Sequence, residues 1–223
     1  MIYELAKKNE NVIFMGSDLS PGLLSEMKKT LPNNHFMEGI SEANLIGVCA
    51  GLASEGFFPF FTTIATFLTR RSYEQIYVDV GLHNLPVRLV GIGAGLNYSS
   101  LGPTHLAIDD ISLMRNIPNM TILICSDKDE MKAAMNQIND IKTPVYIRLA
   151  KGFDPIVKFP SDFKKIGEPR KVIYKKESYP IVISTGIMTY KVQNVLKKIN
   201  KNINHLHLNT INPESKKKIL RLI

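Results

Sequence analysis

The stretch HFMEGISEANLIGVCAGLASEGFFPFF, residues 35–61, decides the fold of this chain. Residues 35–39 predict a short strand, residues 42–55 a helix that ends at Gly56, and residues 57–61 a second strand. A helix that joins two successive strands predicts a parallel β-α-β unit. From Leu45 to Ala53 every residue is apolar or glycine, so we expect this helix to be buried on all sides. The acidic side chain of Glu42 in its first turn is therefore unexpected.

The same alternation of strands and helices continues along the chain. Further strands are predicted at NVIFMG (11–16), PVRLVGIG (86–93), MTILIC (120–125) and PVYIRLA (144–150). Helices are predicted at SPGLLSEMKKTL (20–31), FLTRRSYEQIYVDVG (67–81), AIDDISLMRNI (107–117) and SDKDEMKAAMNQIND (126–140). In the last helix, Ser126 and Asp129 have the spacing of a capping box. Continuous Val/Ile/Leu strands between helices predict an α/β fold with a doubly wound, mostly parallel sheet.

A change in composition after residue 150 predicts a second, smaller domain. We expect one domain over residues 1–152 and a Pro-, Lys- and Gly-rich linker over residues 153–178. Residues 179–223 hold two further β-α pairs, PIVISTG with TYKVQNVLKKI and INHLHLN with PESKKKILRLI. Two such pairs are too few for a typical independent domain, so this part predicts a partial, truncated α/β domain.

Charge, apolar run length and cysteine usage limit the possible partners. The 223 residues carry a formal net charge of +8, but no groove-reading helix or aromatic RNA platform accompanies the lysines, so no nucleic-acid partner is expected. The longest apolar run, FFPFFTTIATFL at residues 57–68, is too short to cross a membrane. Cys49 and Cys125 lie in apolar runs without metal-ligand spacing, which favours reduced core residues of a cytoplasmic protein.

The loop after the fourth predicted strand is a candidate ligand loop. GIGAGL, residues 91–96, lacks the third glycine of a dinucleotide-binding motif and does not open a helix. Its glycines favour a loop that passes close to a bulky group. The loop ends in GPTH, residues 102–105, and long loops after parallel strands carry ligand-binding groups in α/β folds. Taken singly, Glu42, Phe67 and His105 each have an ordinary structural explanation, so the residues alone predict only an α/β protein with a ligand loop.

Taken together, four stretches resemble the pyrimidine-binding domain of transketolase-like thiamine diphosphate enzymes. They are GSDLS (16–20), FMEGISEANLIGVCAGLASEG (36–56), PFFTTIATFLTRRSYEQI (59–76) and LGPTHLAIDDISLMRNIPNMTILICSDKDEM (101–131). They occur in the family's order and span about residues 10–150. The part after residue 150 resembles the linker and the first part of the family's C-terminal domain.

The resemblance implies a role for the unexpected carboxylate. In the family, the acid of the G-I-x-E motif, here Glu42, binds N1′ of the cofactor's aminopyrimidine and so favours loss of the thiazolium C2 proton. Phe67 matches the aromatic residue that stacks on the pyrimidine, and Arg71 and His105 match positions that face the substrate channel. The resemblance thus implies catalytic roles for Glu42 and His105, and cofactor binding by Asp18, Ile40, Glu42, Phe67 and Arg71.

The resemblance also implies a partner subunit. The family holds the diphosphate and Mg²⁺ with a G-D-G motif in a separate domain, and this sequence contains no G-D-G. No metal ligand is therefore expected in this chain. We expect an N-terminal, diphosphate-binding partner, in an assembly with a homodimer core or two copies of each chain. The resemblance implies the C-terminal subunit of a split enzyme that transfers a two-carbon ketol unit between sugars or sugar phosphates.

Two departures and three alternatives remain open. Gly93 stands where typical transketolases have a histidine, and Leu101 where they have an aspartate. Both family residues touch sugar hydroxyls, so the resemblance implies an unusual sugar. One alternative is a subunit like 1-deoxy-D-xylulose 5-phosphate synthase, and another is one like the beta subunit of a 2-oxo acid dehydrogenase. The third is a truncated homologue without catalytic activity.

Overall fold

The chain folds into two compact units. The structure, a computed structural model, describes residues 1–17, 22, 24–152, 154–199 and 202–211. The first unit comprises residues 1–121 and 139–151, and the second comprises residues 122–138 and those from 152 onward. The domain boundaries expected from the sequence, near residues 152 and 178, remain a prediction.

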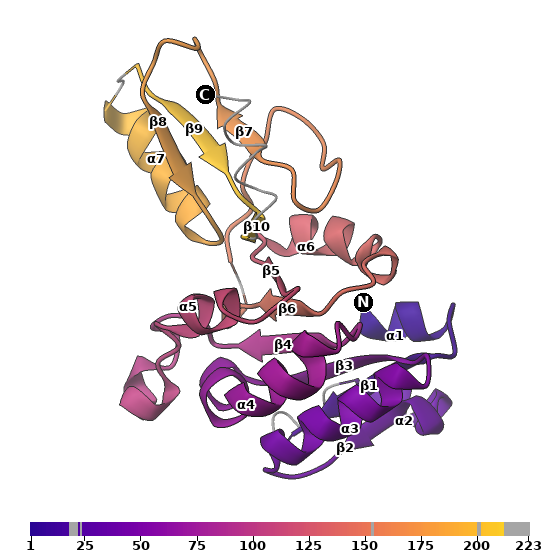
Figure 1. Ribbon diagram of the computed structural model, residues 1–223. Coiled ribbons are helices and arrows are strands. Elements are labelled where there is room, and N and C mark those ends of the chain that lie inside the picture. Colours follow the sequence, from indigo (N-terminus) through magenta and orange to yellow (C-terminus); the bar gives the residue numbers. More distant parts are fainter. Residues whose placement is uncertain (18–21, 23, 153, 200–201, 212–223) are drawn as a thin grey trace. The chain divides into compact units, whose positions relative to one another are not determined.

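A parallel sheet forms the centre of the first unit (Figure 1). Its strands lie in the order β2, β1, β3, β4, β6, and each adjacent pair is parallel. They are β1 (Val12–Gly16), β2 (His35–Met37), β3 (Phe58–Ile64), β4 (Arg88–Ile92) and β6 (Val145–Arg148). All of β1 and nearly all of β3 is buried, as expected for parallel strands that helices cover on both faces. The predicted doubly wound α/β fold is confirmed.

Strand β1 marks the point where the strand order reverses. The chain places β2 on one side of β1 and then β3 on the other. In open α/β sheets, ligands bind beyond the carboxyl ends of the strands at such a switch point. The ends of β1 and β3 are therefore the first place to look for a site.

Helices connect the strands of this sheet. They are α1 (Ile2–Ala6), α2 (Ser25–Thr30), α3 (Glu42–Ser54), α4 (Tyr73–Gln75) and α5 (Asp110–Arg115). Helix α4 continues on either side into π-helical turns at Phe67–Arg71 and Ile76–Leu82. Such π turns are rare and often occur at functional sites.

Helix α3 is buried on one side only. Leu45, Ile46 and Cys49 lie in the core, and the helix packs on β3. Its other side exposes Gly47, Val48 and Gly51, so the expected burial on all sides is wrong. A helix in the outer layer of a sheet domain has a second face, and apolar composition alone does not show that something covers it.

The loop that follows β4 turns back sharply on itself. Gly93 has a positive φ of 78°, and a side chain at this position would collide with the ring of Tyr98. The expectation that these glycines allow close approach to a bulky group is confirmed. A bridge between Gly95 and Ala107 then closes the loop.

The second unit contains a small mixed sheet. Strand β9 (Asn204–His207) pairs in parallel with β8 (Ile181–Ser184) and antiparallel with β7 (Arg170–Ile173). The other elements of the unit are α6 (Lys128–Met135), α7 (Met188–Ile199), β10 (Thr210–Ile211) and β5 (Thr121–Leu123), whose first residue belongs to the first unit. Strand β7 lies inside the stretch expected to be a linker. That stretch therefore contributes an edge strand to the unit.

The cap of α6 differs from the expected one by a single residue. Asp127, not Ser126, occupies the N-cap and accepts hydrogen bonds from the backbone N–H groups of Asp129 and Glu130. The carboxylate of Glu130 reaches back to the N–H of Ser126 at 2.7 Å. The expected capping box of Ser126 with Asp129 is thus wrong: Asp127 is the N-cap, and Glu130 bonds the N–H of the residue before it.

Candidate active site at the switch point

Glu42 lies at the start of α3 with a fully enclosed carboxylate. Its side chain is 1% exposed. One carboxylate oxygen, Oε2, accepts a hydrogen bond from Nη1 of Arg71 at 2.6 Å. The other, Oε1, has a longer contact of 3.4 Å with the hydroxyl of Thr63. A buried carboxylate needs such partners, because burial without them carries a large desolvation cost.

Two hydroxyls support Glu42 from the sheet. Thr63 lies near the carboxyl end of β3, and Ser17 directly follows β1. Their hydroxyl oxygens are 2.8 Å apart and buried. When Thr63 donates to Glu42, Ser17 donates to Thr63, so the three groups form one hydrogen-bonded series. This series spans β1 and β3, so the carboxylate lies at the switch point of the sheet.

Phe67 and Arg71 stack on one another in the first π turn. The guanidinium carbon of Arg71 lies 4.4 Å from the centroid of the Phe67 ring. Phe67 is half-buried, whereas the side chain of Arg71 is 45% exposed. The guanidinium therefore bridges the aromatic ring and the carboxylate of Glu42. Both contacts are of kinds that a flat, cationic group makes well.

His105 approaches the same aromatic ring from the loop that follows β4. Its ring centroid is 5.0 Å from that of Phe67, with the planes at 69°. Nδ1 lies 3.0 Å from the hydroxyl of Thr104. The ring of Tyr98 also lies edge-on to this histidine, with the two ring centroids 6.5 Å apart. Among the described residues Nε2 of His105 has no hydrogen-bond partner, so this nitrogen is available to a ligand.

Ion pairs tie the loop to the helical segment that carries Phe67. Arg70 donates to both carboxylate oxygens of Asp109, at 2.8 and 2.9 Å, and to the carbonyl of Leu106. Arg148 and the hydroxyl of Tyr146 both bind Asp110, at 2.7 and 2.8 Å. These bonds fix the segment after His105 and so hold its ring beside Phe67.

The structure thus brings Glu42, Phe67, Arg71 and His105 together. Ile40 lies two residues before α3, and its side chain is 67% exposed. Asp18 falls outside the residues that the structure describes. The roles of all six residues remain a prediction. Sequence reasoning missed Ser17, Thr63 and Tyr98, although the rule that sites follow the carboxyl ends of strands points to the first two.

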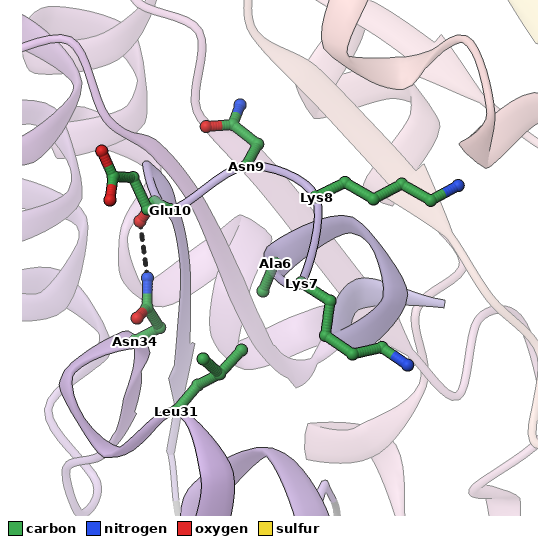
Figure 2. A pocket seen from close by; sticks show the side chains of 7 residues that line it. All are labelled: Ala6, Lys7, Lys8, Asn9, Glu10, Leu31 and Asn34. Carbon is green, nitrogen blue, oxygen red and sulfur yellow. Dashed lines mark hydrogen bonds between the residues drawn. The ribbon is translucent and has the colours of Figure 1, made fainter.

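A surface depression elsewhere on the first unit is not a candidate site. It has a volume of about 590 Å³ and lies among Ala6, Lys7, Lys8, Asn9, Glu10, Leu31 and Asn34 (Figure 2). Glu10 and Asn34 precede β1 and β2, so the depression lies at the amino ends of these strands. Asn34 donates to the carbonyl of Glu10 at 2.6 Å, which uses its amide for the chain itself. The rule for α/β sheets favours the opposite edge.

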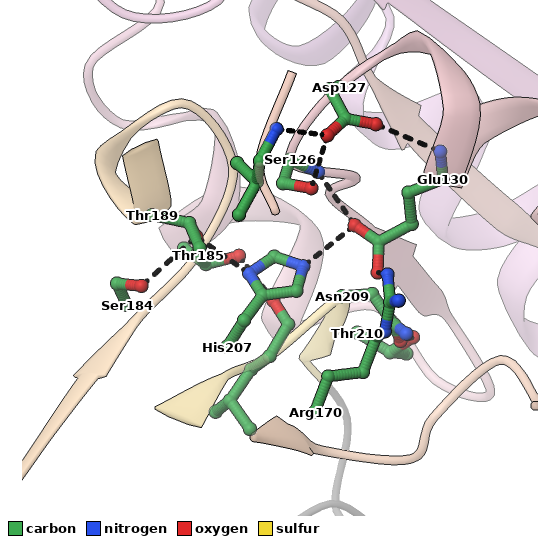
Figure 3. Close-up of polar contacts among 12 residues, drawn as sticks. Ser126, Asp127, Glu130, Arg170, Ser184, Thr185, Thr189, His207, Asn209 and Thr210 are labelled. Atoms are coloured by element: carbon green, nitrogen blue, oxygen red, sulfur yellow. Dashed lines mark hydrogen bonds and ion pairs between the residues drawn. The ribbon is translucent and has the colours of Figure 1, made fainter. Parts of the chain in front are cut away.

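A second polar cluster holds the second unit together (Figure 3). Figure 3 shows His207 between Thr189 and Glu130. Its Nδ1 lies 2.7 Å from the hydroxyl of Thr189, and its Nε2 lies 2.8 Å from Oε2 of Glu130. Glu130 also pairs with Arg170 at 3.0 Å. Burial raises the pKa of Glu130, but His207, the N–H of Ser126 and Arg170 outweigh it and lower that pKa to about 2. These residues are structural: they join α6 to β7 and β9.

The chain of hydrogen bonds continues from Thr189 into the core of this unit. Ser184 donates to Thr189 at 3.0 Å and lies 2.7 Å from Nε2 of His205. Burial, with a smaller contribution from His207, lowers the pKa of His205 to about 4. Each hydroxyl in this hydrogen-bonded series can donate once and accept once. The folded unit thus favours uncharged His205.

Two absences hold for the part of the chain that the structure describes. No group of three His, Cys, Asp or Glu side chains there is arranged to hold a metal ion. None of the helices there is long and apolar enough to cross a membrane.

Comparison with known proteins identifies the family. Residues 1–153 match the model for the transketolase pyrimidine-binding domain. The 6-deoxy-6-sulfo-D-fructose transketolase subunit of Clostridium sp. (strain MSTE9) is 32% identical over 189 residues, which are 84% of this chain and 58% of that protein. The 1-deoxy-D-xylulose-5-phosphate synthase of Clostridium perfringens (strain SM101 / Type A) is 32% identical over 216 residues, 92% of this chain but 33% of that protein.

A solved structure agrees with this assignment. The protein described as a split gene transketolase, inactive beta4 tetramer, superposes with a TM-score of 0.80 at 30% identity. The match covers 94% of this chain and 69% of that one. The chain therefore spans 33% to 69% of the length of these relatives. Through its pyrimidine-binding domain, the chain belongs to the transketolase family.

Proposed function

We propose that this chain is the C-terminal, pyrimidine-binding subunit of a split transketolase-like enzyme. With a partner, it transfers a two-carbon ketol unit between sugars through thiamine diphosphate. The observation that carries this proposal is the enclosed carboxylate of Glu42 at the switch point, next to the half-buried ring of Phe67. Such a pair fits an aminopyrimidine, since a carboxyl group binds its ring nitrogen and an aromatic ring stacks on its face.

The surroundings of Glu42 suit this contact. Among the described residues, Oε1 has only the long contact with Thr63 and Oε2 only the bond with the partly exposed Arg71, so the carboxylate can take up another partner. The carboxylate of Glu42 is enclosed, and a hydrogen bond away from water is stronger than the same bond in water. Stacking on Phe67 contributes about 1 kcal/mol beyond the burial of area. Glu42 would bind and orient the pyrimidine, and Ser17 and Thr63 would keep the carboxylate aimed at it.

The cofactor would supply the chemistry that this chain lacks. When bound, thiamine diphosphate stabilises the carbanion that remains after a ketose C–C bond is broken. We assign its diphosphate and the Mg²⁺ to a partner subunit. The names of the relatives support this assignment, because one is a transketolase subunit and the other a split gene transketolase. An assembly with two copies of each chain, or with a homodimer of this chain at its core, is the arrangement we propose.

We place this assembly in the cytoplasm. Cys49 and Cys125 are both free thiols. Burial raises the pKa of the Cys49 thiol to about 12, which leaves it unreactive. Free buried thiols are typical of proteins in a reducing compartment.

The substrate of this enzyme would be a sugar or sugar derivative outside the pentose phosphates. His105 offers Nε2 toward it, and Arg71 offers a partly exposed charge. Gly93 and Leu101 replace the two side chains with which typical transketolases touch sugar hydroxyls. The relative that acts on a sulfo sugar supports this proposal.

The test is ketol transfer by the chain after co-expression with its diphosphate-binding partner. We expect transfer from a ketose donor to an aldose acceptor that depends on thiamine diphosphate and Mg²⁺. Glu42→Gln should lower the rate at least 100-fold, the scale of losing one positioned catalytic group. Glu55→Gln, at the exposed end of α3, is the matched control and should keep the rate. Full activity of the pair that carries Glu42→Gln would refute the catalytic role assigned to Glu42.

A second candidate is a synthase that uses a 2-oxo acid in place of the ketose. It rests on the similarity to 1-deoxy-D-xylulose-5-phosphate synthase over 92% of this chain. The same pair, given pyruvate and glyceraldehyde 3-phosphate, distinguishes the two functions. Release of CO₂ would favour the synthase, and ketol transfer without CO₂ would favour the transketolase. A pair that binds the cofactor but does neither would be a non-catalytic homologue.

A further inference from the structure

A single guanidinium engages both groups that the proposed function assigns to the cofactor ring. Nη1 of Arg71 lies 2.6 Å from Oε2 of Glu42, and its guanidinium carbon lies 4.4 Å from the centre of Phe67. A guanidinium is flat, carries N–H donors at its edge and stacks on aromatic rings. An aminopyrimidine has the same three properties. The side chain of Arg71 thus makes the contacts that the ring would make.

The two occupants exclude one another. The guanidinium lies between the carboxylate and the ring, because it is bonded to the first and stacked on the second. A pyrimidine that stacks on this face of Phe67 and binds Glu42 needs the same space. Binding of the ring therefore requires that Arg71 leave.

The partners differ in how firmly they are held. Glu42 is enclosed, and the hydroxyl of Thr63 lies against its other oxygen. Arg71 is 45% exposed and, among the described residues, its polar contacts all go to Glu42. The adjacent Arg70 shows the contrast, since Asp109 and the carbonyl of Leu106 fix its guanidinium. Arg71 is thus the member that can swing out to solvent.

We propose that Arg71 is a displaceable stand-in for the aminopyrimidine ring. In the chain without cofactor, its guanidinium compensates the buried carboxylate and covers the ring of Phe67. The incoming aminopyrimidine takes over both contacts and releases Arg71, whose charge then becomes available to the substrate. The inference rests on the proposed function, and it turns Arg71 from a cofactor ligand into a competitor of the cofactor.

The stand-in role of Arg71 predicts opposite effects of one substitution on the stability of the chain and on its affinity for the cofactor. Arg71→Met keeps the length of the side chain but removes its charge and its planar donors. The chain alone should lose thermal stability, because a buried carboxylate without its counter-charge is costly. The pair should bind thiamine diphosphate more tightly, because the competitor is gone. If the stand-in occupies the site nine times in ten, the gain in affinity is about tenfold.

The experiment measures both quantities without any activity assay. Calorimetric titration of the co-expressed pair with thiamine diphosphate in saturating Mg²⁺ gives the dissociation constant. Thermal unfolding of the chain alone gives Tm for Arg71→Met, Glu42→Gln and the double variant. The loss of Tm caused by Arg71→Met should shrink when Glu42 is already Gln. Arg115→Met, on the exposed end of α5, controls for the lost charge and should change neither quantity.

Each outcome decides the matter. Lower Tm together with tighter binding supports the stand-in. Binding by the Arg71→Met pair that equals or falls below that of the unsubstituted pair overturns it and makes Arg71 a cofactor ligand. Arg71→Lys serves if the methionine variant does not fold, since it keeps the charge but not the planar stacking, and it should still bind more tightly. No binding by any pair, the unsubstituted one included, would instead refute the proposed function and the inference with it.

Discussion

Replacement of Glu130 by Gln should remove the more acidic part of the acid sensitivity of the second unit. In the folded chain the pKa of Glu130 is lowered to about 2, against 4.5 for the ordinary side chain. A carboxyl group whose folded-state pKa is depressed stabilises the fold above its unfolded pKa and stops doing so as the pH falls. Its contribution is therefore complete above about pH 5 and lost toward pH 2.

The size of the effect follows from the shift. A difference of about 2.5 pKa units corresponds to about 3 kcal/mol at neutral pH, of which about 2 kcal/mol is lost by pH 3. His205 acts at higher pH, because burial lowers its pKa from 6.5 to about 4. As the pH falls through that range, the unfolded chain takes up a proton that the folded unit does not, and stability falls. As the pH falls, the unsubstituted chain should thus lose stability over two successive pH ranges, first that of His205 and then that of Glu130.

The assay is urea unfolding at pH values from 7 to 3, followed by far-UV circular dichroism. The Glu130→Gln variant should be less stable than the unsubstituted chain at pH 7. On acidification it should show only the loss of stability below pH 6.5 that belongs to His205. Glu177→Gln, an exposed residue of the same unit, is the matched control and should follow the unsubstituted chain. Parallel pH curves for Glu130→Gln and the unsubstituted chain would show that the network does not lower the pKa of Glu130.

Three further predictions concern the first unit and the thiols. Burial raises the pKa of both cysteines, to about 12 for Cys49 and well above the ordinary value for Cys125, so neither should react with a thiol reagent at pH 8 until urea unfolds the chain. Fast labelling of the folded chain would contradict this. Gly93→Ala should lower Tm, because its φ is 78° and the methyl group would meet Tyr98, whereas Gly47→Ala on the open face of α3 should raise stability by up to about 1 kcal/mol. Equal shifts for both would refute the assigned geometry. Thr63→Val should weaken cofactor binding by the pair about fivefold, the scale of about 1 kcal/mol for one long hydrogen bond, and unchanged binding would show that Thr63 does not position Glu42.

Parts of the fold that depend on local pattern could be predicted from the sequence. The strands at residues 12–16 and 88–92 follow from continuous apolar runs, and the parallel sheet follows from the helices between them. Strand β7 could not be predicted in the same way. It is short, only partly buried, and formed by pairing with β9 more than 30 residues later in the chain. Its environment, not its own residues, makes it a strand.

The cap of α6 shows a second limit. Ser126 with Asp129 and Asp127 with Glu130 have the same spacing, one residue apart. Both fit the rule, and the choice depends on where the backbone enters the helix. Glu130 settles it, because its carboxylate is held by His207 and Arg170, two residues far away in the sequence.

The candidate site likewise contains features that the sequence could predict and features that it could not. Glu42, Phe67 and His105 could be found because they belong to motifs of a known family. The contact of Arg71 with Glu42 could not, because it joins residues 29 positions apart and depends on the π turn at Phe67–Arg71. Motifs identify residue types, whereas the competition between a side chain and a ligand for one position is visible only in three dimensions.

The central claim is that Glu42 binds the ring nitrogen N1′ of the aminopyrimidine. The most direct test compares thiamine diphosphate with an analogue whose N1′ is replaced by CH, each titrated into the co-expressed pair. The unsubstituted pair should bind the natural cofactor about 10- to 100-fold more tightly, the scale of one hydrogen bond to a charged group. In the Glu42→Gln pair this preference should fall several-fold. The same preference in both pairs would show that Glu42 does not bind N1′.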